Sequence, residues 1–325
     1  MSTRHAGGHP VRVVTGSALP EPSRRSPMPL HAIPRRLVTA FVVLGAAAPV
    51  LTACALIRPA DPEHDTQVAL EHIHGLASDP ETRGLLIASH GGVYQLDALT
   101  PTAELTGPLA GNDFDAMGFT AIDGALYASG HPGENSPDHF GAQNLGLIRS
   151  DDNARTWTNI AFTGEADFHD LAISASDQDR IYANNYGIVY RSDDGGRTWN
   201  DGVGVDAHDI LADPNDADIV YATTPEGLYV SHDAGETFEL DQNAPRMMLI
   251  AANTYGLLIG TSFDGALVYQ LPSGEWATGG EYAGTAQALT ITPAGEVALV
   301  DNRGIVLTSD FGATWTPIYR PEPHT

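Results

Sequence analysis

Ser192-Asp193-Asp194-Gly195-Gly196-Arg197-Thr198-Trp199 is the stretch of sequence that decides the fold. It has the chemistry of a hairpin turn, because an aspartate such as Asp194 accepts hydrogen bonds from nearby backbone N–H groups. Gly196 can adopt a positive φ without steric cost. The ring of Trp199 opens the next strand and is large enough to bury against a neighbouring sheet.

The same pattern, Ser/Thr-x-Asp-x-Gly-x-Thr-Trp/Phe, recurs at residues 150–157, 231–238 and 308–315, with Ala154 in place of the glycine in the first of these. The four aspartates are Asp152, Asp194, Asp233 and Asp310. They are about 40 residues apart, except for a last gap of about twice that length. A decayed copy that keeps Trp276 fills this gap, and a copy without the motif lies upstream at residues 85–96.

Each repeat has room for four short strands, which in the third unit we place at residues 170–174, 180–184, 187–191 and 198–202. Units of about 40 residues with four strands are typical of propeller blades. The sequence therefore predicts an all-β protein, a six-bladed β-propeller with four-stranded antiparallel blades. The units are 70–111, 112–164, 165–203, 204–243, 244–283 and 284–320. Seven blades or an open stack are the structural alternatives.

The N-terminal segment has the features of an export signal. Arg35-Arg36 precede an apolar run at residues 37–51, which is followed by a small-residue cleavage site and Cys54. Leu51-Thr52-Ala53-Cys54 resembles the lipobox of bacterial lipoproteins, which implies cleavage before Cys54, lipidation of that residue and attachment to the extracytoplasmic side of the cell membrane. We therefore assign residues 1–53 to an N-terminal extension and signal peptide, 54–69 to a lipidated tether, 70–320 to the propeller and 321–325 to a tail. Met28 as the true start and an uncleaved anchor remain open.

Composition excludes some partners and cross-links. The chain has 325 residues and a formal net charge of −25, and six of its 16 basic residues precede Cys54. The part after Cys54 is thus still more acidic, and such a surface repels nucleic acid and anionic lipid headgroups. Cys54 is the only cysteine, so an intramolecular disulfide is impossible.

Histidines gather at one predicted end of the propeller. The entries to the innermost strands and the loops between second and third strands lie at the same end of the channel. The residues placed there are His72, His74, His90, His131, His169 and His208, together with Asp115. Imidazole with carboxylate suits a transition metal such as Zn or Cu. The alternative is structural, with each histidine bonding a neighbouring blade. A long loop at residues 129–145 could add His139, Glu134 and Asp138.

The repeated motif resembles the Asp box of sialidases and sortilin-type receptors, in which the box is structural and lies away from the active face. True sialidase activity would need three arginines for a substrate carboxylate, and only Arg246 and Arg303 are placed on the functional face. A closer resemblance is to bacterial Asp-box lipoproteins described as glycosylhydrolase-like, which also open with a stretch like His72-Ile73-His74-Gly75. Photosystem II assembly factors share such repeats but use an arginine-rich face that this chain lacks.

Three functions remain open at this point. The first is an exported, lipid-anchored binding protein with a histidine-lined site at the channel mouth, whose ligand is a metal, a glycan or another small molecule. The second is a glycoside hydrolase with paired carboxylates, for which the candidates are Asp115, Asp170, Asp209 and Asp301. The third is a protein-docking platform.

Overall fold

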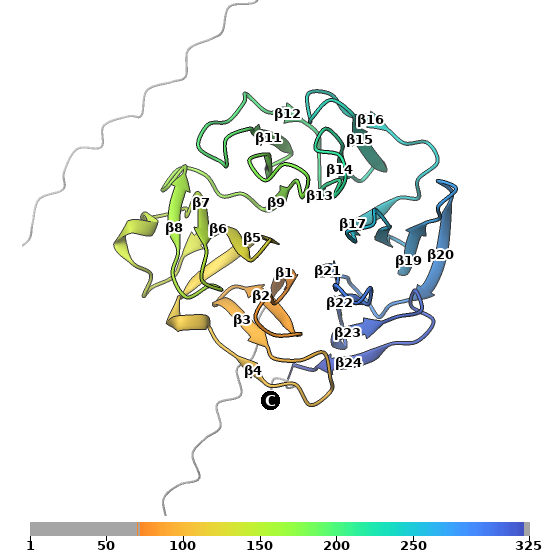
Figure 1. The fold of residues 1–325 in the computed structure, drawn as a ribbon, viewed down its shortest axis with the longest axis horizontal. Coiled ribbons are helices and arrows are strands. Elements are labelled where there is room, and N and C mark those ends of the chain that lie inside the picture. Colours follow the sequence, from red (N-terminus) through yellow and green to blue (C-terminus); the bar gives the residue numbers. More distant parts are fainter. Residues whose placement is uncertain (1–69, 71, 322–325) are drawn as a thin grey trace, which may run out of the picture. The chain divides into compact units, whose positions relative to one another are not determined.

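The computed structural model describes Leu70 and residues 72–321, which form six four-stranded antiparallel sheets around a central axis (Figure 1). The predicted six-bladed β-propeller is confirmed. Helical structure in the described residues is limited to the short 3₁₀ helices η1 (Leu109–Gly111) and η2 (Asp138–Phe140), and none of it is long and apolar enough to cross a membrane. The predicted signal peptide, Cys54, its tether and residues 322–325 lie outside the described residues.

Every blade is made of four strands that follow one another in the chain. The first three blades are β1 (Ile73–Ser78), β2 (Leu85–Ser89), β3 (Gly92–Leu96), β4 (Leu105–Thr106); β5 (Phe114–Ile122), β6 (Ala125–Pro132), β7 (Leu147–Ser150), β8 (Thr158–Ala161); β9 (Asp170–Ile173), β10 (Ile181–Asn185), β11 (Ile188–Ser192), β12 (Val203–Gly204). The last three are β13 (Asp209–Ala212), β14 (Val220–Thr223), β15 (Leu228–Ser231), β16 (Glu239–Leu240); β17 (Met247–Ala252), β18 (Leu258–Ser262), β19 (Ala266–Gln270), β20 (Trp276–Glu281); β21 (Ala288–Ile291), β22 (Val297–Asp301), β23 (Gly304–Thr308), β24 (Thr316–Tyr319).

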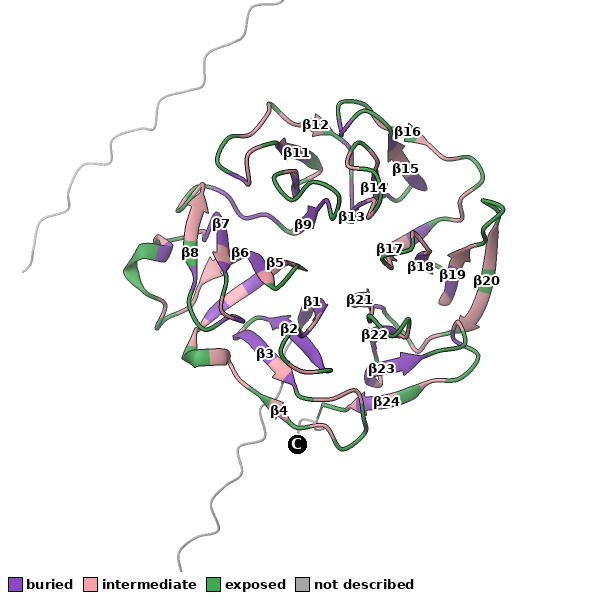
Figure 2. Ribbon diagram, in the orientation of Figure 1, coloured by how far each residue is buried: buried purple, intermediate pink, exposed green. Residues whose placement is uncertain are grey.

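The second strand of each blade is largely buried on both faces, because each blade packs between two others (Figure 2). Strand β2 shows this clearly, since all five of its residues are buried. Successive side chains of a strand point to opposite faces. Leu85 and Ile87 accordingly pack toward the sixth blade, and Leu86 and Ala88 toward the second. This explains why these strands are nearly continuous apolar runs in the sequence.

The ring closes by packing between the first and last blades, since every described sheet is built from consecutive strands. Hydrogen bonds cross this interface from Leu70 N–H to Tyr319 Oη at 3.5 Å and from Ile73 N–H to Gln287 Oε1 at 3.4 Å. Most of the contact is apolar. The buried residues of the closing cluster are Leu70, Ile73, Leu76, Leu85, Ile87, Tyr94, Leu96, Ala288, Ala298, Val300, Ile305, Leu307 and Ile318.

The repeated turn has the geometry that its sequence predicts. Asp194 Oδ1 accepts the backbone N–H groups of Arg197 and Thr198 at 3.0 and 2.8 Å, and Asp194 Oδ2 accepts the Thr198 hydroxyl at 2.7 Å. The Ser192 hydroxyl donates to Asp194 at 2.9 Å, and Gly196 has φ 86°. Asp152, Asp233 and Asp310 hold the equivalent turns with the same bonds to threonine.

The outer strand of the third blade differs from the prediction. It was expected at residues 198–202, but β12 is Val203–Gly204. Asn200 Oδ1 accepts the backbone N–H groups of Arg191 and Gly202 at 2.8 and 3.2 Å. This side chain takes the place of a strand partner, so regular pairing with β11 begins only after it.

Hydrogen bonds in these turns stabilise the ionised carboxylates. The Thr198 backbone N–H and hydroxyl lower the pKa of Asp194 to about 2, and the equivalent bonds from Thr237 lower the pKa of Asp233 to about 2. The pKa values of Asp152 and Asp310 are lowered in the same way. A carboxyl group that is harder to protonate in the folded state stabilises the fold above its ordinary pKa. That stabilisation is lost as the pH falls from about 4 to about 2.

We expect Asp194→Asn to lower the stability of the protein near pH 7, with a difference from the parent that shrinks as the pH falls toward 2. Asparagine has one acceptor oxygen and cannot replace both carboxylate oxygens of the turn. Urea unfolding at several pH values measures the effect, with the exposed Asp264 changed to asparagine as the control. An Asp194→Asn deficit that stays constant with pH would contradict the assigned role of the ionised carboxylate.

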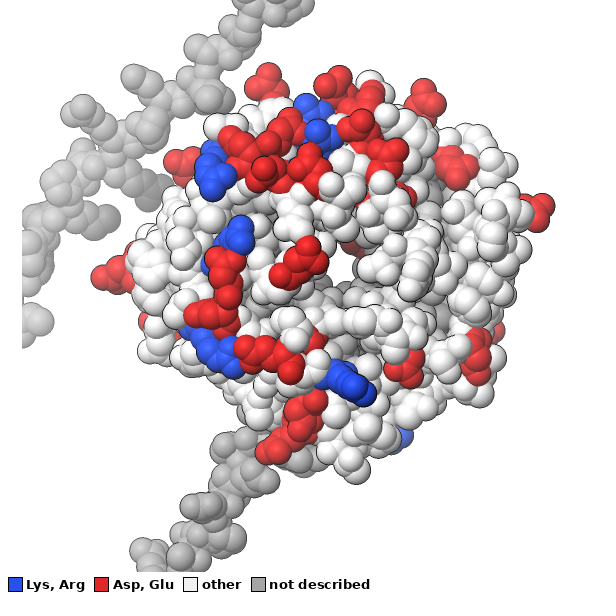
Figure 3. Space-filling model, viewed as in Figure 1, with Lys and Arg blue, Asp and Glu red and all other residues white. Residues whose placement is uncertain are grey.

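The two ends of the propeller differ in their connections. Turns between first and second strands and between third and fourth strands, including the aspartate turns, share one end. Turns between second and third strands and the links between blades share the other. On the face in Figure 3 acidic side chains predominate and basic ones lie among them. Ion pairs such as Arg155–Glu81 at 2.8 Å and Arg180–Asp218 at 2.6 Å hold neighbouring blades at the aspartate-turn end.

Candidate functional site

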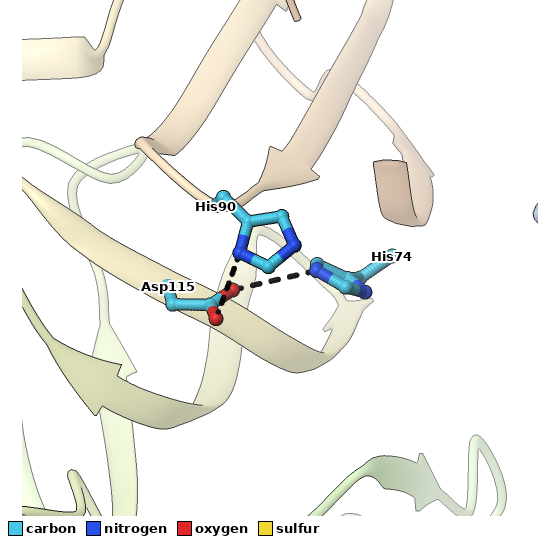
Figure 4. A group of neighbouring side chains, drawn as sticks. All are labelled: His74, His90 and Asp115. Atoms are coloured by element: carbon cyan, nitrogen blue, oxygen red, sulfur yellow. Dashed lines mark ion pairs between the residues drawn. The ribbon is translucent and has the colours of Figure 1, made fainter. Parts of the chain in front are cut away.

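Three side chains from the first two blades meet at the end opposite the aspartate turns (Figure 4). His74 Nε2 lies 3.4 Å from Asp115 Oδ1, and His90 Nδ1 lies 3.0 Å from Asp115 Oδ2. One ligand atom from each of the three residues lies within 4.8 Å of the others. We call these residues, His74, His90 and Asp115, the Asp115 group.

Local backbone structure explains how these side chains converge. His74 is the extra residue of a bulge in β1, because the pairing with β2 shifts between Ile73 and Gly75. Bulges re-aim a side chain that would otherwise follow the strand alternation. His90 occupies the turn between β2 and β3, and Asp115 is the second residue of β5 in the next blade. The site therefore exists only when the first two blades are packed together.

The Asp115 group combines a shielded interior with an open side. The side chains of His74 and Asp115 are 20% and 18% exposed, whereas that of His90 is 45% exposed. Burial by itself would raise the pKa of Asp115, but the contact with His74 and the charges of His74, His90 and His131 together lower it. Asp115 is thus an anionic group surrounded by imidazoles, a donor set suited to a divalent cation.

A second carboxylate with two histidines lies in the neighbouring blades. Asp167 Oδ2 is 3.1 Å from His131 Nε2 and 3.0 Å from His169 Nε2. The hydrogen bond to Asp167 raises the pKa of His169. We call Asp167, His131 and His169 the Asp167 group. His131 and His169 were predicted from the sequence, but Asp167 was missed, although Asp167-Phe168-His169 places it two residues before His169.

The other predicted histidines are placed differently. The His72 ring packs edge-on against His90, with ring centroids 5.0 Å apart, and therefore borders the Asp115 group. His208 belongs to neither group; its ring centroid is 6.2 Å from that of Phe263, a residue of the fifth blade. The six histidines thus do not converge on one point, because the blades that carry them are spread around the axis.

The long loop after β6 is fixed to the propeller. The Phe140 side chain is 1% exposed and packs edge-on against Phe114, and the Asn159 amide donates to the His139 carbonyl at 2.7 Å. Glu134, Asp138 and His139 are not among the side chains that contact Asp115 or Asp167 in the described structure. The structure therefore does not bring them to the site as the sequence had suggested.

The carboxylates of the remaining hydrolase candidates make structural contacts. Asp170 accepts the Ile210 backbone N–H, and Asp209 accepts the Ile250 backbone N–H at 2.7 Å, so each carboxylate joins its blade to the next. Asp301, with a side chain that is 0% exposed, pairs with Arg303. None of these three, of the four proposed from the sequence, is free to act on a ligand at the mouth.

The carboxyl groups of Asp170 and Asp209 nevertheless have raised pKa values. Both line a central cavity of about 500 Å³ that the innermost strands of all six blades enclose. Burial raises the pKa of Asp170 to about 6, and burial together with the charge of Asp170 raises that of Asp209 well above its usual value. Two adjacent carboxyl groups cannot both ionise cheaply in such surroundings. The two carboxyl groups, which lie in the wall of the channel, therefore favour a state in which they share one proton.

The two arginines assigned to the functional face do not form a carboxylate clamp. The Arg303 guanidinium pairs with Asp301, and Arg246 lies over the Phe263 ring at 5.3 Å and donates to the Pro225 carbonyl.

Exposed aromatic side chains lie beside the histidines. Tyr186, in the turn between β10 and β11, is 77% exposed, and its ring centroid is 4.9 Å from that of His169. Phe263, in the turn between β18 and β19, is 42% exposed. These rings give the same end of the propeller an apolar contact surface next to the imidazole groups.

Comparisons with known proteins show a similarity of fold only. No protein-family model and no curated protein sequence matches the chain. Among solved structures, the GH74 xyloglucanase from Xanthomonas campestris is similar over 77% of this chain and 46% of that one, with 17% identity and a TM-score of 0.52. The extracellular domain of a one component system from B. thetaiotaomicron is similar over 76% of this chain and 33% of that one, with 13% identity and a TM-score of 0.50. This chain thus spans less than half of either structure, and it is similar to both as a β-propeller.

Proposed function

We propose that the protein binds a divalent transition-metal ion, such as Zn²⁺ or Cu²⁺, through His74, His90 and Asp115 at the open end of the propeller. It would do so as an exported binding protein that Cys54 tethers to the cell membrane, and its repeats would make it an Asp-box propeller. The carrying observation is a pair of buried atoms, His74 Nε2 and Asp115 Oδ1. They lie 3.4 Å apart, and neither makes a well-aligned hydrogen bond with any other described residue.

The contact between these two atoms is long for a hydrogen bond, and a cation bound between them would satisfy both more fully. A buried polar atom without a hydrogen bond costs roughly 1–3 kcal/mol, so folded proteins rarely leave one unsatisfied. Here two of them face each other at 3.4 Å. Two tetrahedral ligands at about 2.0–2.2 Å from a zinc ion are separated by about that distance. A cation between them would satisfy both atoms at once.

The types of ligand atom favour a transition-metal ion, and their number favours a site with an open coordination position. Two imidazoles with one carboxylate suit Zn²⁺, Cu²⁺ or Ni²⁺ better than Ca²⁺ or Mg²⁺, which prefer oxygen ligands. Three protein ligands leave a fourth position open, as in sites that exchange water or bind substrate. The 45% exposure of the His90 side chain supports an open position that faces solvent. The proposal is therefore a metal site with room for a further ligand.

The rival functions have less support from the geometry. A hydrolase of this fold would need two available carboxylates, and Asp170, Asp209 and Asp301 are engaged as described above. Docking of another protein finds support in the exposed rings of Tyr186 and Phe263. These rings are separate from the Asp115 group, so docking is compatible with metal binding and does not explain the unsatisfied atoms.

Zinc titration of the full-length protein tests the proposal, in a Cys54→Ser background so that the one thiol contributes no ligand. We expect stoichiometric binding that loses one equivalent in a His74→Ala, His90→Ala double variant and is unchanged in His208→Ala. Competition with a chromogenic chelator reports the binding, and copper is titrated in parallel. A parent that binds neither ion, or a double variant that binds as the parent does, would show the proposal to be wrong.

A further inference from the structure

Two grooves of the same construction open at the outer rim of the propeller. One lies between the second and third blades and has a volume of about 630 Å³, and the other lies between the third and fourth blades and has a volume of about 490 Å³. In each, the outer strand of one blade, β8 or β12, forms one wall (Figure 1). The third strand and the aspartate turn of the next blade form the other. Ligand pockets typically have volumes of about 300–1,000 Å³.

Each groove contains two aromatic rings at equivalent positions of the repeat. Trp199 and Phe238 end the two aspartate turns, and we name the grooves after them. Tyr190 and Tyr229 lie two residues before the serines that begin those turns. All four rings are partly exposed. Trp199 stacks on Phe168 with ring centroids 5.5 Å apart, so the core fixes the indole while the rest of its surface lines the groove. A ring held in this way offers an apolar face to a ligand.

The charged side chains at the edges of the two grooves differ. Arg197 and Asp201 line the Trp199 groove, whereas Asp206, Glu226 and Glu236 line the Phe238 groove. All five are exposed. Arg197 of one repeat is replaced by Glu236 in the next, so a ligand common to both grooves cannot depend on one sign of charge. A hydroxyl group suits both edges, because it donates to a carboxylate and accepts from a guanidinium.

We propose that the Trp199 and Phe238 grooves bind a neutral glycan chain. The apolar C–H faces of its sugar rings lie against the aromatic rings, and its hydroxyl groups bond to the polar side chains at the edges. The two grooves share the third blade, and two such sites on one protein raise the affinity for a chain of repeated units above that of either groove. This binding is separate from the Asp115 group and requires no metal ion.

Electrophoresis through native gels that contain a neutral polysaccharide tests the proposal. Glucomannan, hydroxyethylcellulose, laminarin and dextran are compared, and at least one should retard the full-length Cys54→Ser protein. A Tyr190→Leu, Tyr229→Leu double variant should lose this retardation, because leucine keeps the apolar packing of the strand but removes the flat ring. Tyr255→Leu is the matched control, since this ring is 91% exposed and lies outside both grooves, and it should be retarded as the parent is.

Tryptophan fluorescence provides a second measurement that does not depend on the folding of the double variant. The retarding polysaccharide should change the fluorescence of the parent. Trp199→Phe copies the ring of the other groove, so it should still be retarded but lose that change. Arg197→Glu copies the other edge and should bind as the parent does.

Four results would overturn the proposal. In the first, none of the four polysaccharides retards the parent, including the case in which decaproline, an extended peptide, changes the tryptophan fluorescence instead. In the second, the tyrosine double variant is retarded as the parent is. In the third, the full fluorescence change survives in Trp199→Phe, which would place the ligand elsewhere. In the fourth, Arg197→Glu abolishes binding, which would show that the ligand is selected by charge.

Discussion

Asp115→Asn is expected to weaken zinc binding at the Asp115 group by about 100-fold or more. Loss of a residue that merely supports a metal ligand costs about 10–100-fold in affinity, so loss of the anionic ligand itself should reach at least the upper end of that range. Asparagine preserves the size of the side chain but replaces a charged oxygen by a neutral one. His74 and His90 both contact this carboxylate, so the change also removes the group that orients them.

The dissociation constant for this position is measured by chelator competition in the Cys54→Ser background, which contributes no thiol ligand. Asp264→Asn removes the same charge from the same end of the propeller without touching the histidines, and it controls for a general electrostatic effect. An Asp115→Asn affinity within a few-fold of the background would mean that the carboxylate is not a ligand.

The fold was predictable from the sequence because its signal is local and repeated. The aspartate turn uses only residues within one hairpin, so four copies set the spacing of the blades and the positions of two decayed copies followed from it. The outer strand of the third blade was misplaced because its position depends on one side chain and not on the repeat. Asn200 replaces a strand partner with its side chain, and no period in the sequence marks that substitution.

The candidate site was predictable only in part. Counting blades placed His74, His90, His131 and His169 at one end, but sorting them into two groups depends on the angle between blades. The bulge that re-aims His74 arises from a shift in pairing with β2, which the sequence does not show. Asp167 could have been found, since the two-residue period that paired His72 with His74 also pairs it with His169.

Ile87→Ala is expected to lower the free energy of unfolding by about 2–5 kcal/mol, the usual cost of removing a large buried aliphatic side chain. Ile87 is 0% exposed and belongs to the apolar cluster that joins the first blade to the last. No described sheet combines strands from the two ends of the chain, so little besides this packing holds the ring closed. The loss should therefore not be compensated by strand pairing.

Ile181→Ala provides the matched comparison, because Ile181 is also 0% exposed but packs between the second and third blades, which the chain itself connects. Urea unfolding of both variants gives the two free energies, and hydrogen exchange shows where each protein opens. Similar costs with a single cooperative transition mean that closure is as strong as the internal interfaces. A cost below about 1 kcal/mol for Ile87→Ala alone would show that the closing interface contributes little. The same measurement bears on the proposed metal site. Asp115 and its two histidines join the first blade to the second, so a weak closing interface would leave these residues beside the part of the ring that opens first.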